Sequence, residues 1–376
     1  MAVDIVPTVI YSSMLGITVL ALVNALDKPK YKPNLYLAGL LGLLTVHILG
    51  ELYIYSGFYR YAPWLAGAQM PIRTLLGPAL YLYAHAVMSP DHKFPKKPAL
   101  LAVLGPFSVV LLMLPFLFQL SPQEKLALAD PATRIPEHWQ IAVFTCVSTM
   151  LVFVIFTGAY LAATLKLHHN HKAQLMRRFS SIEGRSLDWF KVVLILWGVA
   201  WLLYAIEYTL SFMSWKWFGS GIVLPIAEAF ILMLFAHLAL KQNVLEDSDR
   251  GEPQTAATRE ASLPEVRMQE IARHLQRVMG DDKMYCDEEL SLNTLSNAID
   301  VSENHISETL SQHLHTNFFH FVNSYRVKAA QDLLSSSDKL VSTIAYEVGF
   351  NSKSTFNSAF KKVSGMTPTA YRTSVS

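Results

Sequence analysis

The sequence predicts an all-α protein in two parts, a bundle of seven membrane-crossing helices followed by a water-soluble helical domain. Hydrophobic residues make up 52% of the 376 residues and charged residues only 16%, an unusual balance for a chain that is soluble throughout. The apolar residues gather between Met1 and Leu240, whereas from Lys241 onward no apolar run exceeds a few residues. We therefore expect the first part of the chain to fold in lipid and the second part to fold in water.

The first part contains seven stretches that are long enough to cross a hydrocarbon core of roughly 30 Å as helices. The first stretch has no basic start and no small-residue cleavage site before Lys28, so it is expected to be a membrane helix and not a cleaved signal peptide. We assign residues 1–240 to a seven-transmembrane sensor or anchor domain. The seven stretches are 5–26, 34–57, 63–88, 98–119, 137–167, 188–212 and 219–240.

The basic residues of the connectors between these stretches predict the orientation in the membrane. Eleven Lys and Arg residues lie in or at the edge of the first, third and fifth connectors, whereas the second, fourth and sixth connectors contain four. Cytoplasmic loops are enriched in Lys and Arg, so the odd connectors are expected in the cytoplasm and the amino terminus outside. Seven crossings then place the carboxyl-terminal part in the cytoplasm.

Ionisable residues inside the apolar stretches are candidate functional sites, because charges are costly there, and we single out five of them. They are His47, Glu51, Arg73, Glu207 and Glu228. The predicted orientation puts Arg73 and the three acids in the outer half of the membrane, so we expect a sensor cavity that is open to the outside. The alternative is a purely structural pair of Arg73 with one acid. Three acids against one Arg, however, leave a carboxylate that needs a proton, a cation or water.

Neither a metal site nor a reaction centre is expected. His168, His169 and His171 lack an acidic or cysteine partner, so we expect them in a solvated loop. Cys146 and Cys286 lie in different environments, so no disulfide is expected. No nucleophile with its base, no phosphate-binding glycine loop and no metal-ligand set is evident, which predicts that the protein is not an enzyme and has no cofactor.

The second part begins with a polar segment and continues as a series of short helices. Residues 241–263 have no hydrophobic period, which is typical of a flexible linker. An amphipathic helix is expected from Pro264 to Gly280. From Leu290 one arrangement occurs twice, a short helix, a turn and a second helix capped by a serine, with a long helix between the two copies. The two units span about 290–314 and 340–363.

The second unit contains a specific run of residues. It reads Ile344-Ala345-Tyr346-Glu347-Val348-Gly349-Phe350, followed by Phe360-Lys361-Lys362 and Gly365-Met366-Thr367-Pro368. This run resembles the second helix-turn-helix of the AraC/XylS family of transcription regulators, and the resemblance covers roughly Leu290 to Arg372. It implies a cytoplasmic AraC-type DNA-binding domain over 264–376, in which the second helix of each unit enters the major groove.

The resemblance also implies which residues meet DNA. The base-facing residues are Asn304, Ser307 and Glu308 in the first unit and Lys353, Ser354, Asn357 and Ser358 in the second. Asn suits adenine, Ser is permissive and Glu accepts only from a cytosine amine. Lys361, Lys362 and Arg372 are assigned to phosphates, and Arg326 to a phosphate contact or an ion pair at the edge of the core.

Together these features imply a regulator in the cytoplasmic membrane of a bacterium that couples an outer-side signal to gene expression. The expected partners are double-stranded promoter or operator DNA, the lipid bilayer, RNA polymerase, and a small ligand or partner protein at the outer side; a homodimer is left open. Two alternatives remain at this point. One is a transporter or membrane enzyme with an appended regulatory DNA-binding domain, and the other is a passive anchor with sensing by a partner.

Overall fold

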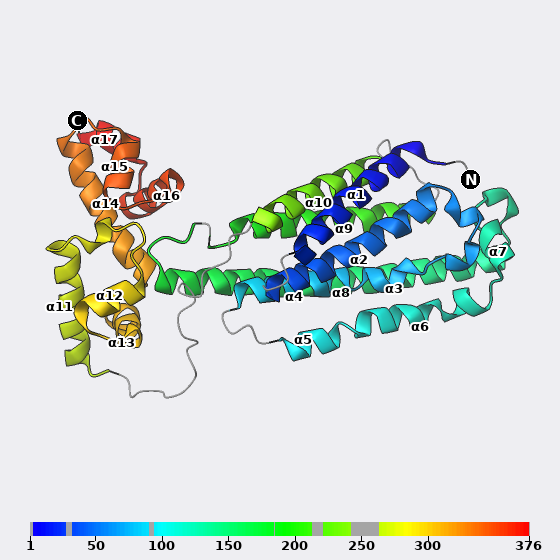
Figure 1. Ribbon diagram of the computed structural model, residues 1–376, viewed down its shortest axis with the longest axis horizontal. Helices are drawn as coiled ribbons and strands as arrows, with labels where there is room; N and C mark the ends of the chain where they lie inside the picture. The colour runs from blue at the N-terminus through cyan, green and yellow to red at the C-terminus, as the bar shows by residue number, and fades with distance from the viewer. Residues whose placement is uncertain are drawn as a thin grey trace. The chain divides into compact units, whose positions relative to one another are not determined.

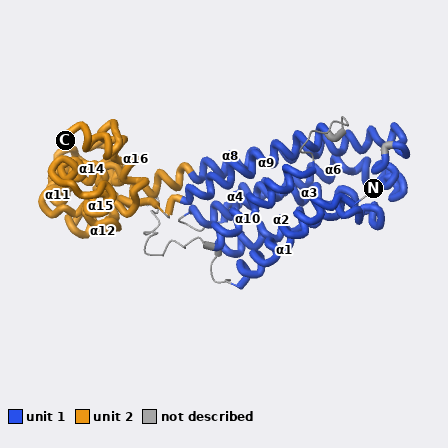
Figure 2. Tube along the Cα trace, turned by 90° about the horizontal axis from the view of Figure 1, so that it is seen from above, with its two compact units in different colours: residues 1–168, 187–246 blue, residues 169–186, 247–376 orange. Residues whose placement is uncertain are grey.

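The computed structural model describes residues 3–27, 32–89, 94–183, 185–212, 221–241 and 263–375. Within these ranges the chain is helical apart from turns and one isolated β-bridge, which confirms the predicted all-α class. It divides into two compact units, unit 1 with residues 1–168 and 187–246, and unit 2 with residues 169–186 and 247–376 (Figure 2). Nearly all of the predicted linker, and the connector residues Lys28, Lys30, Lys93 and Lys216, lie outside the described residues.

Unit 1 is a bundle of long apolar helices (Figure 1). Among the described residues, six helical stretches are long and apolar enough to cross a membrane, namely α1, α2, α5 with α6, α8, α9 and α10. The helices are α1 (Ile5–Asp27), α2 (Lys32–Tyr55), α3 (Gln69–Arg73), α4 (Leu76–Met88), α5 (Lys96–Leu101), α6 (Leu104–Phe118), α7 (Pro122–Ala127), α8 (Pro136–Arg178), α9 (Asp188–Phe212) and α10 (Val223–Lys241).

The third predicted span, 63–88, is not one continuous helix. It forms the 3-10 turn η2 (Pro63–Leu65) and the helices α3 and α4, with a break at Thr74 and Leu75. Pro78 has no N–H to donate to the Thr74 carbonyl, and its ring crowds that carbonyl, so the helix restarts there. The two pieces still follow one another beside α2 (Figures 1 and 2). The structure thus shows six long apolar helices in the described part of the chain where seven were expected.

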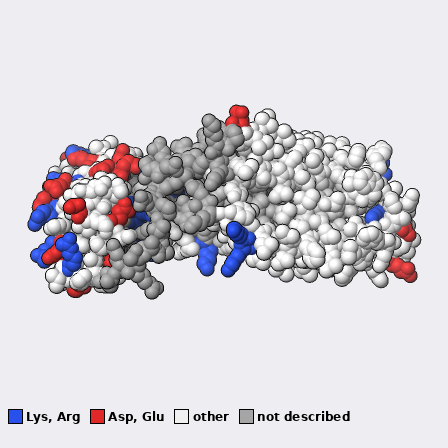
Figure 3. All heavy atoms as spheres, turned by 60° about the horizontal axis from the view of Figure 1, so that its bottom comes forward, with Lys and Arg blue, Asp and Glu red and all other residues white. Residues whose placement is uncertain are grey.

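Apolar side chains cover both the inside and the outside of unit 1. Leu40, Ile48 and Phe235 are fully buried in its core, whereas Leu20 and Phe118 are 72% and 81% exposed. On the face drawn in Figure 3, charged side chains lie near the ends of unit 1 and uncharged residues lie between them. Helices that are apolar on all sides are typical of membrane spans, because an outward apolar face is stable in lipid and costly in water.

Unit 2 contains the predicted helix-turn-helix units around two small cores. Ser302 caps α13 by accepting from the His305 N–H, and Ser352 caps α16 by accepting from the Ser354 and Thr355 N–H groups. One core lies under α11 to α13, and the other under α15 and α16. The helices are α11 (Glu265–Gly280), α12 (Leu292–Ile299), α13 (Glu303–Glu308) with the π-helix η6 (Thr309–His313), α14 (Phe318–Ser336), α15 (Val341–Glu347), α16 (Lys353–Ser364) and α17 (Pro368–Val375).

The histidine-rich segment near the end of α8 is helical. The prediction that it forms a solvated loop is therefore wrong. No Gly or Pro interrupts residues 161–178, so the apolar helix continues into polar sequence. His168 and His171 are buried, with His168 Nε2 3.6 Å from Asp188 Oδ1 and His171 Nε2 3.1 Å from the Arg185 carbonyl oxygen. Both histidines therefore lie beside the segment that leads to α9. In the described ranges no group of three His, Cys, Asp or Glu side chains is arranged to hold a metal.

Candidate nucleic-acid interface and buried polar cluster

The second helix-turn-helix unit presents one polar helix face. Phe356 and Phe360 of α16 point into the core and are fully buried. The predicted base-facing residues lie on the other side of the same helix and are exposed. They are Lys353, Ser354, Asn357 and Ser358, and the exposed Lys361 continues their row by one turn. A capped helix with an exposed row of amide, hydroxyl and ammonium groups suits the edges of bases and the flanking phosphates.

The first unit presents less open surface. Asn304 is exposed at the start of α13, whereas Ser307 and Glu308 are half-buried. Glu308 Oε1 accepts a hydrogen bond from the Leu263 N–H at 3.2 Å, just before α11 begins. Glu308 therefore has a partner at the start of α11. The spacing of residues in α13 did not indicate this partner.

Two of the three predicted phosphate contacts have partners within the chain. Arg372 Nη2 donates to the Lys339 carbonyl oxygen at 2.6 Å and so ties α17 to the segment before α15. Lys362 Nζ lies 3.0 Å from His320 Nε2 on α14. Lys361 projects from the exposed face of α16, which makes it the best placed of the three for a phosphate.

The Lys362–His320 contact leads to a pH dependence. Burial, and then the charge of Lys362, lower the pKa of His320 below its usual value. His320 therefore binds a proton more readily in the unfolded chain than in the folded chain. The free energy of unfolding is accordingly lost as pH falls from about 6.5 toward the pKa of His320 in the folded state. Replacing His320 with Gln is expected to remove this small loss, measured as urea unfolding of unit 2 at pH 5 and 7.5. The same change at the exposed His274 is the control, and an equal effect there would contradict the assignment.

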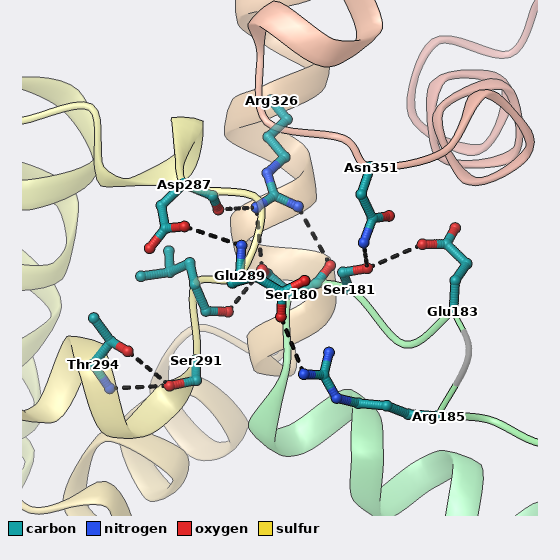
Figure 4. Close-up of polar contacts among 11 residues, drawn as sticks. Ser180, Ser181, Glu183, Arg185, Asp287, Glu289, Ser291, Thr294, Arg326 and Asn351 are labelled. Carbon is teal, nitrogen blue, oxygen red and sulfur yellow. Dashed lines mark hydrogen bonds and ion pairs between the residues drawn. The ribbon is translucent and has the colours of Figure 1, made fainter. Parts of the chain in front are cut away.

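Arg326 is not a phosphate contact, which corrects the sequence-based expectation. Its side chain is fully buried in α14, and its guanidinium donates to backbone carbonyls (Figure 4). Burial lowers the pKa of Arg326 to about 10, so it remains charged at neutral pH. A sequence gives no direct sign of such partners, because every residue carries a carbonyl.

Comparison with known proteins agrees with this geometry. Residues 295–374 match the family model described as a helix-turn-helix domain. An uncharacterized HTH-type transcriptional regulator of Staphylococcus aureus is 35% identical over 106 residues, and the regulatory protein PocR of Salmonella typhimurium is 26% identical over 151 residues. This part of the chain is an AraC-type helix-turn-helix domain.

The matches of the AraC-type domain cover only part of each relative. The alignment covers 26% of this chain and 14% of the staphylococcal protein, and 39% of this chain and 48% of PocR. A solved structure, the carboxyl-terminal domain of AraT, a response regulator from Geobacillus stearothermophilus, is 27% identical, with a TM-score of 0.25 over 28% of this chain and 84% of that structure. The chain thus spans about a seventh of the staphylococcal relative's length.

Unit 1 contains a buried polar cluster that brings together four of the five ionisable residues predicted from the sequence. Arg73 on α3 forms an ion pair with Glu51 on α2 and donates to the hydroxyl of Tyr204 on α9. Glu228 on α10 accepts from the Tyr11 hydroxyl of α1 at 2.9 Å and lies 4.0 Å from His47 Nε2. The cluster therefore joins five helices. Its second carboxylate, Glu228, lies beside a tyrosine hydroxyl and an imidazole.

The fifth predicted residue, Glu207, forms its hydrogen bond with another part of unit 1, although it remains within electrostatic reach of Glu228. Its Oε1 accepts a hydrogen bond from the Gly221 N–H at 2.7 Å, at the start of α10. The tyrosines Tyr11 and Tyr204 complete the cluster in its place. Nothing in the sequence indicated Tyr11, because one tyrosine in an apolar helix is more often an interface anchor.

The cluster is enclosed. His47, Glu51, Arg73 and Glu228 are each less than 9% exposed. A cavity of about 20 Å³ beside Arg73, lined also by Thr149 and Tyr208, has room for about one water molecule. A larger recess of about 440 Å³ lies apart from the cluster, between Arg60 and the α7 segment with Asp130. The cluster as it stands accommodates a proton or a water but not a larger ligand.

Proposed function

We propose that the protein is a membrane-bound transcription regulator that binds promoter DNA through its AraC-type domain and responds to a signal received by unit 1. The observation that carries this proposal is the presence of an AraC-type domain and six membrane-length apolar helices in one chain. An apolar surface of this extent is stable only in lipid, and a helix-turn-helix domain acts only where DNA is. The basic odd connectors support a cytoplasmic AraC-type domain and an outer amino terminus.

Genome-wide mapping of DNA bound by the full-length chain, combined with membrane fractionation, tests this proposal. We expect the protein in the inner-membrane fraction of its bacterial host and discrete bound promoters in the chromosome. Residence in the soluble fraction, or binding without sequence preference, would contradict it. Uptake of candidate compounds into proteoliposomes would be the mark of a transporter, which is the rival in another functional class.

The exposed face of α16 predicts two separable effects on DNA binding. Asn357→Ala is expected to cost about 1–3 kcal/mol on a mapped promoter and little on mixed-sequence duplex, because amides read base edges. Lys361→Ala is expected to weaken binding to both duplexes and to lower the salt slope by about one, because it removes one phosphate contact. Titrations at several salt concentrations measure both. Equal losses for Asn357→Ala on the two duplexes would remove this residue from the base-reading set.

The buried polar cluster is our candidate for the signal receiver. Glu228 is its carboxylate without an arginine partner, so its protonation can change without breaking the Arg73–Glu51 pair. Glu228→Gln keeps the shape of the side chain and is expected to leave membrane abundance unchanged while a promoter reporter loses its response to medium pH. Glu137→Gln is the matched control, because it makes the same change at an exposed position at the start of α8. A normal response in Glu228→Gln would make this carboxylate structural.

A further inference from the structure

The first part of the connector between α8 and α9, residues 179–183, is built into unit 2. Phe179 pairs with Ser291 in an antiparallel β-bridge, and both the N–H and the hydroxyl of Ser180 donate to the Leu290 carbonyl oxygen, at 3.2 and 2.7 Å. Phe179 also forms a buried apolar cluster with Leu175 and Ile182. The connector thus adds an extended segment to the first helix-turn-helix unit, just before α12.

The same connector provides acceptors for the buried Arg326 (Figure 4). The Arg326 guanidinium donates to the Tyr285 and Asp287 carbonyls at 2.7 Å each, and to Asn323 Oδ1 at 3.3 Å. Its other two acceptors belong to Ser180, the hydroxyl at 3.1 Å and the carbonyl at 3.4 Å. A buried cation whose hydrogen bonds are unmade is costly, so the AraC-type domain depends on a residue far outside its own sequence.

A third contact reaches the second helix-turn-helix unit. Asn351 Nδ2 donates to Ser181 Oγ at 2.7 Å, and Ser181 Oγ in turn donates to Glu183 Oε2 at 3.0 Å. Asn351 directly precedes Ser352, the residue that caps α16. The connector therefore touches the first unit at Leu290, the joining helix at Arg326 and the start of the second DNA-facing helix.

We propose that residues 179–183 of the connector form a permanently docked clamp that holds α16 in register with the first helix-turn-helix unit. The role of α8 in this proposal rests on the proposed function. If unit 1 lies in a membrane, α8 is the helix that leaves the membrane and leads to the clamp. It has 43 residues, about 65 Å at 1.5 Å per residue, roughly twice the thickness of a hydrocarbon core. A movement at its end would reach both DNA-binding units through Ser180 and Ser181.

Cross-linking in the full-length chain tests the docking without DNA. Ser181→Cys with Asn351→Cys, in a Cys146→Ala/Cys286→Ser background, is expected to react with a short bifunctional thiol reagent in native membranes. The control pairs Ser181→Cys with Ser364→Cys, at the far end of α16 and about 18 Å from its cap. Efficient linking of the first pair alone, with or without DNA, supports the clamp. Equal yields from both pairs, or linking that DNA abolishes, would overturn it.

Ser180→Ala tests what the clamp does. We expect about tenfold weaker binding of the full-length chain to a mapped promoter, and less than twofold weaker binding to mixed-sequence duplex, because a shift of α16 spoils base reading before phosphate contacts. Ser148→Ala, which removes a hydroxyl that donates to the Phe144 and Thr145 carbonyls within α8, is the control. Binding of Ser180→Ala equal to wild type on the promoter would refute the clamp. If the wild type binds no promoter, the proposed function fails, while the cross-link still decides the docking.

Discussion

Replacing Gly349 with alanine is expected to unfold the second helix-turn-helix unit and abolish sequence-specific DNA binding. Gly349 has φ of +92°, a conformation that L side chains rarely adopt. An added Cβ would lie 2.4 Å from the Tyr285 carbonyl oxygen and 2.8 Å from that of Cys286. The Tyr285 carbonyl also accepts from Arg326, so the backbone there cannot move away cheaply. We expect a loss of about 3 kcal/mol or more of unfolding free energy, from backbone strain and overpacking together.

Limited proteolysis in membranes at increasing urea concentration measures this loss, with promoter binding as a second readout. Gly365→Ala is the matched control, because Gly365 has φ of +80° at the end of α16 but nothing within 4 Å of its added Cβ. It is expected to lose only about 1 kcal/mol from backbone strain. If the two variants lose the same free energy, contact with the Tyr285 backbone contributes nothing.

Replacing Arg73 with methionine is expected to have the largest effect in unit 1. The change leaves Glu51 buried without its cation and removes the partner of the Tyr204 hydroxyl. Breaking a buried pair from one side costs about 3–5 kcal/mol, because the remaining charge has no compensation. We expect the variant to reach the membrane in much lower amount, measured by quantitative immunoblotting and by thermal aggregation in detergent.

A second substitution distinguishes an unpaired charge from lost packing. Arg73→Met with Glu51→Gln removes both charges and is expected to recover much of the lost stability, since neutral groups cost less to bury. Arg60→Met, at an exposed position before the third apolar stretch, is expected to have little effect. If the double variant is no more stable than Arg73→Met alone, the charge of Glu51 is not the cause of the loss.

Local signals predicted the parts of this protein whose structure depends on near neighbours in the chain. Ser302 and Ser352 precede the helices that they cap, and the predicted second unit, 340–363, contains α15 and nearly all of α16. A serine hydroxyl reaches an N–H only two or three residues away, so its effect is visible in a short window of sequence. The long apolar stretches were equally clear, but Pro78 divided the third one, because one missing N–H outweighs a favourable composition.

Partners that come from distant parts of the chain were decided by the tertiary structure alone. The sequence indicated that Glu51, Arg73, Glu207 and Glu228 are unusual in apolar helices, but only the packing of α2 against α3 pairs Glu51 with Arg73 and leaves Glu207 at a turn. Arg326 shows most clearly that a sequence does not indicate the partners of a buried side chain. Its acceptors include two backbone carbonyls and the carbonyl and hydroxyl of Ser180, 146 residues away. Every residue has a carbonyl, so a sequence indicates which side chains need partners, while the fold selects the partners.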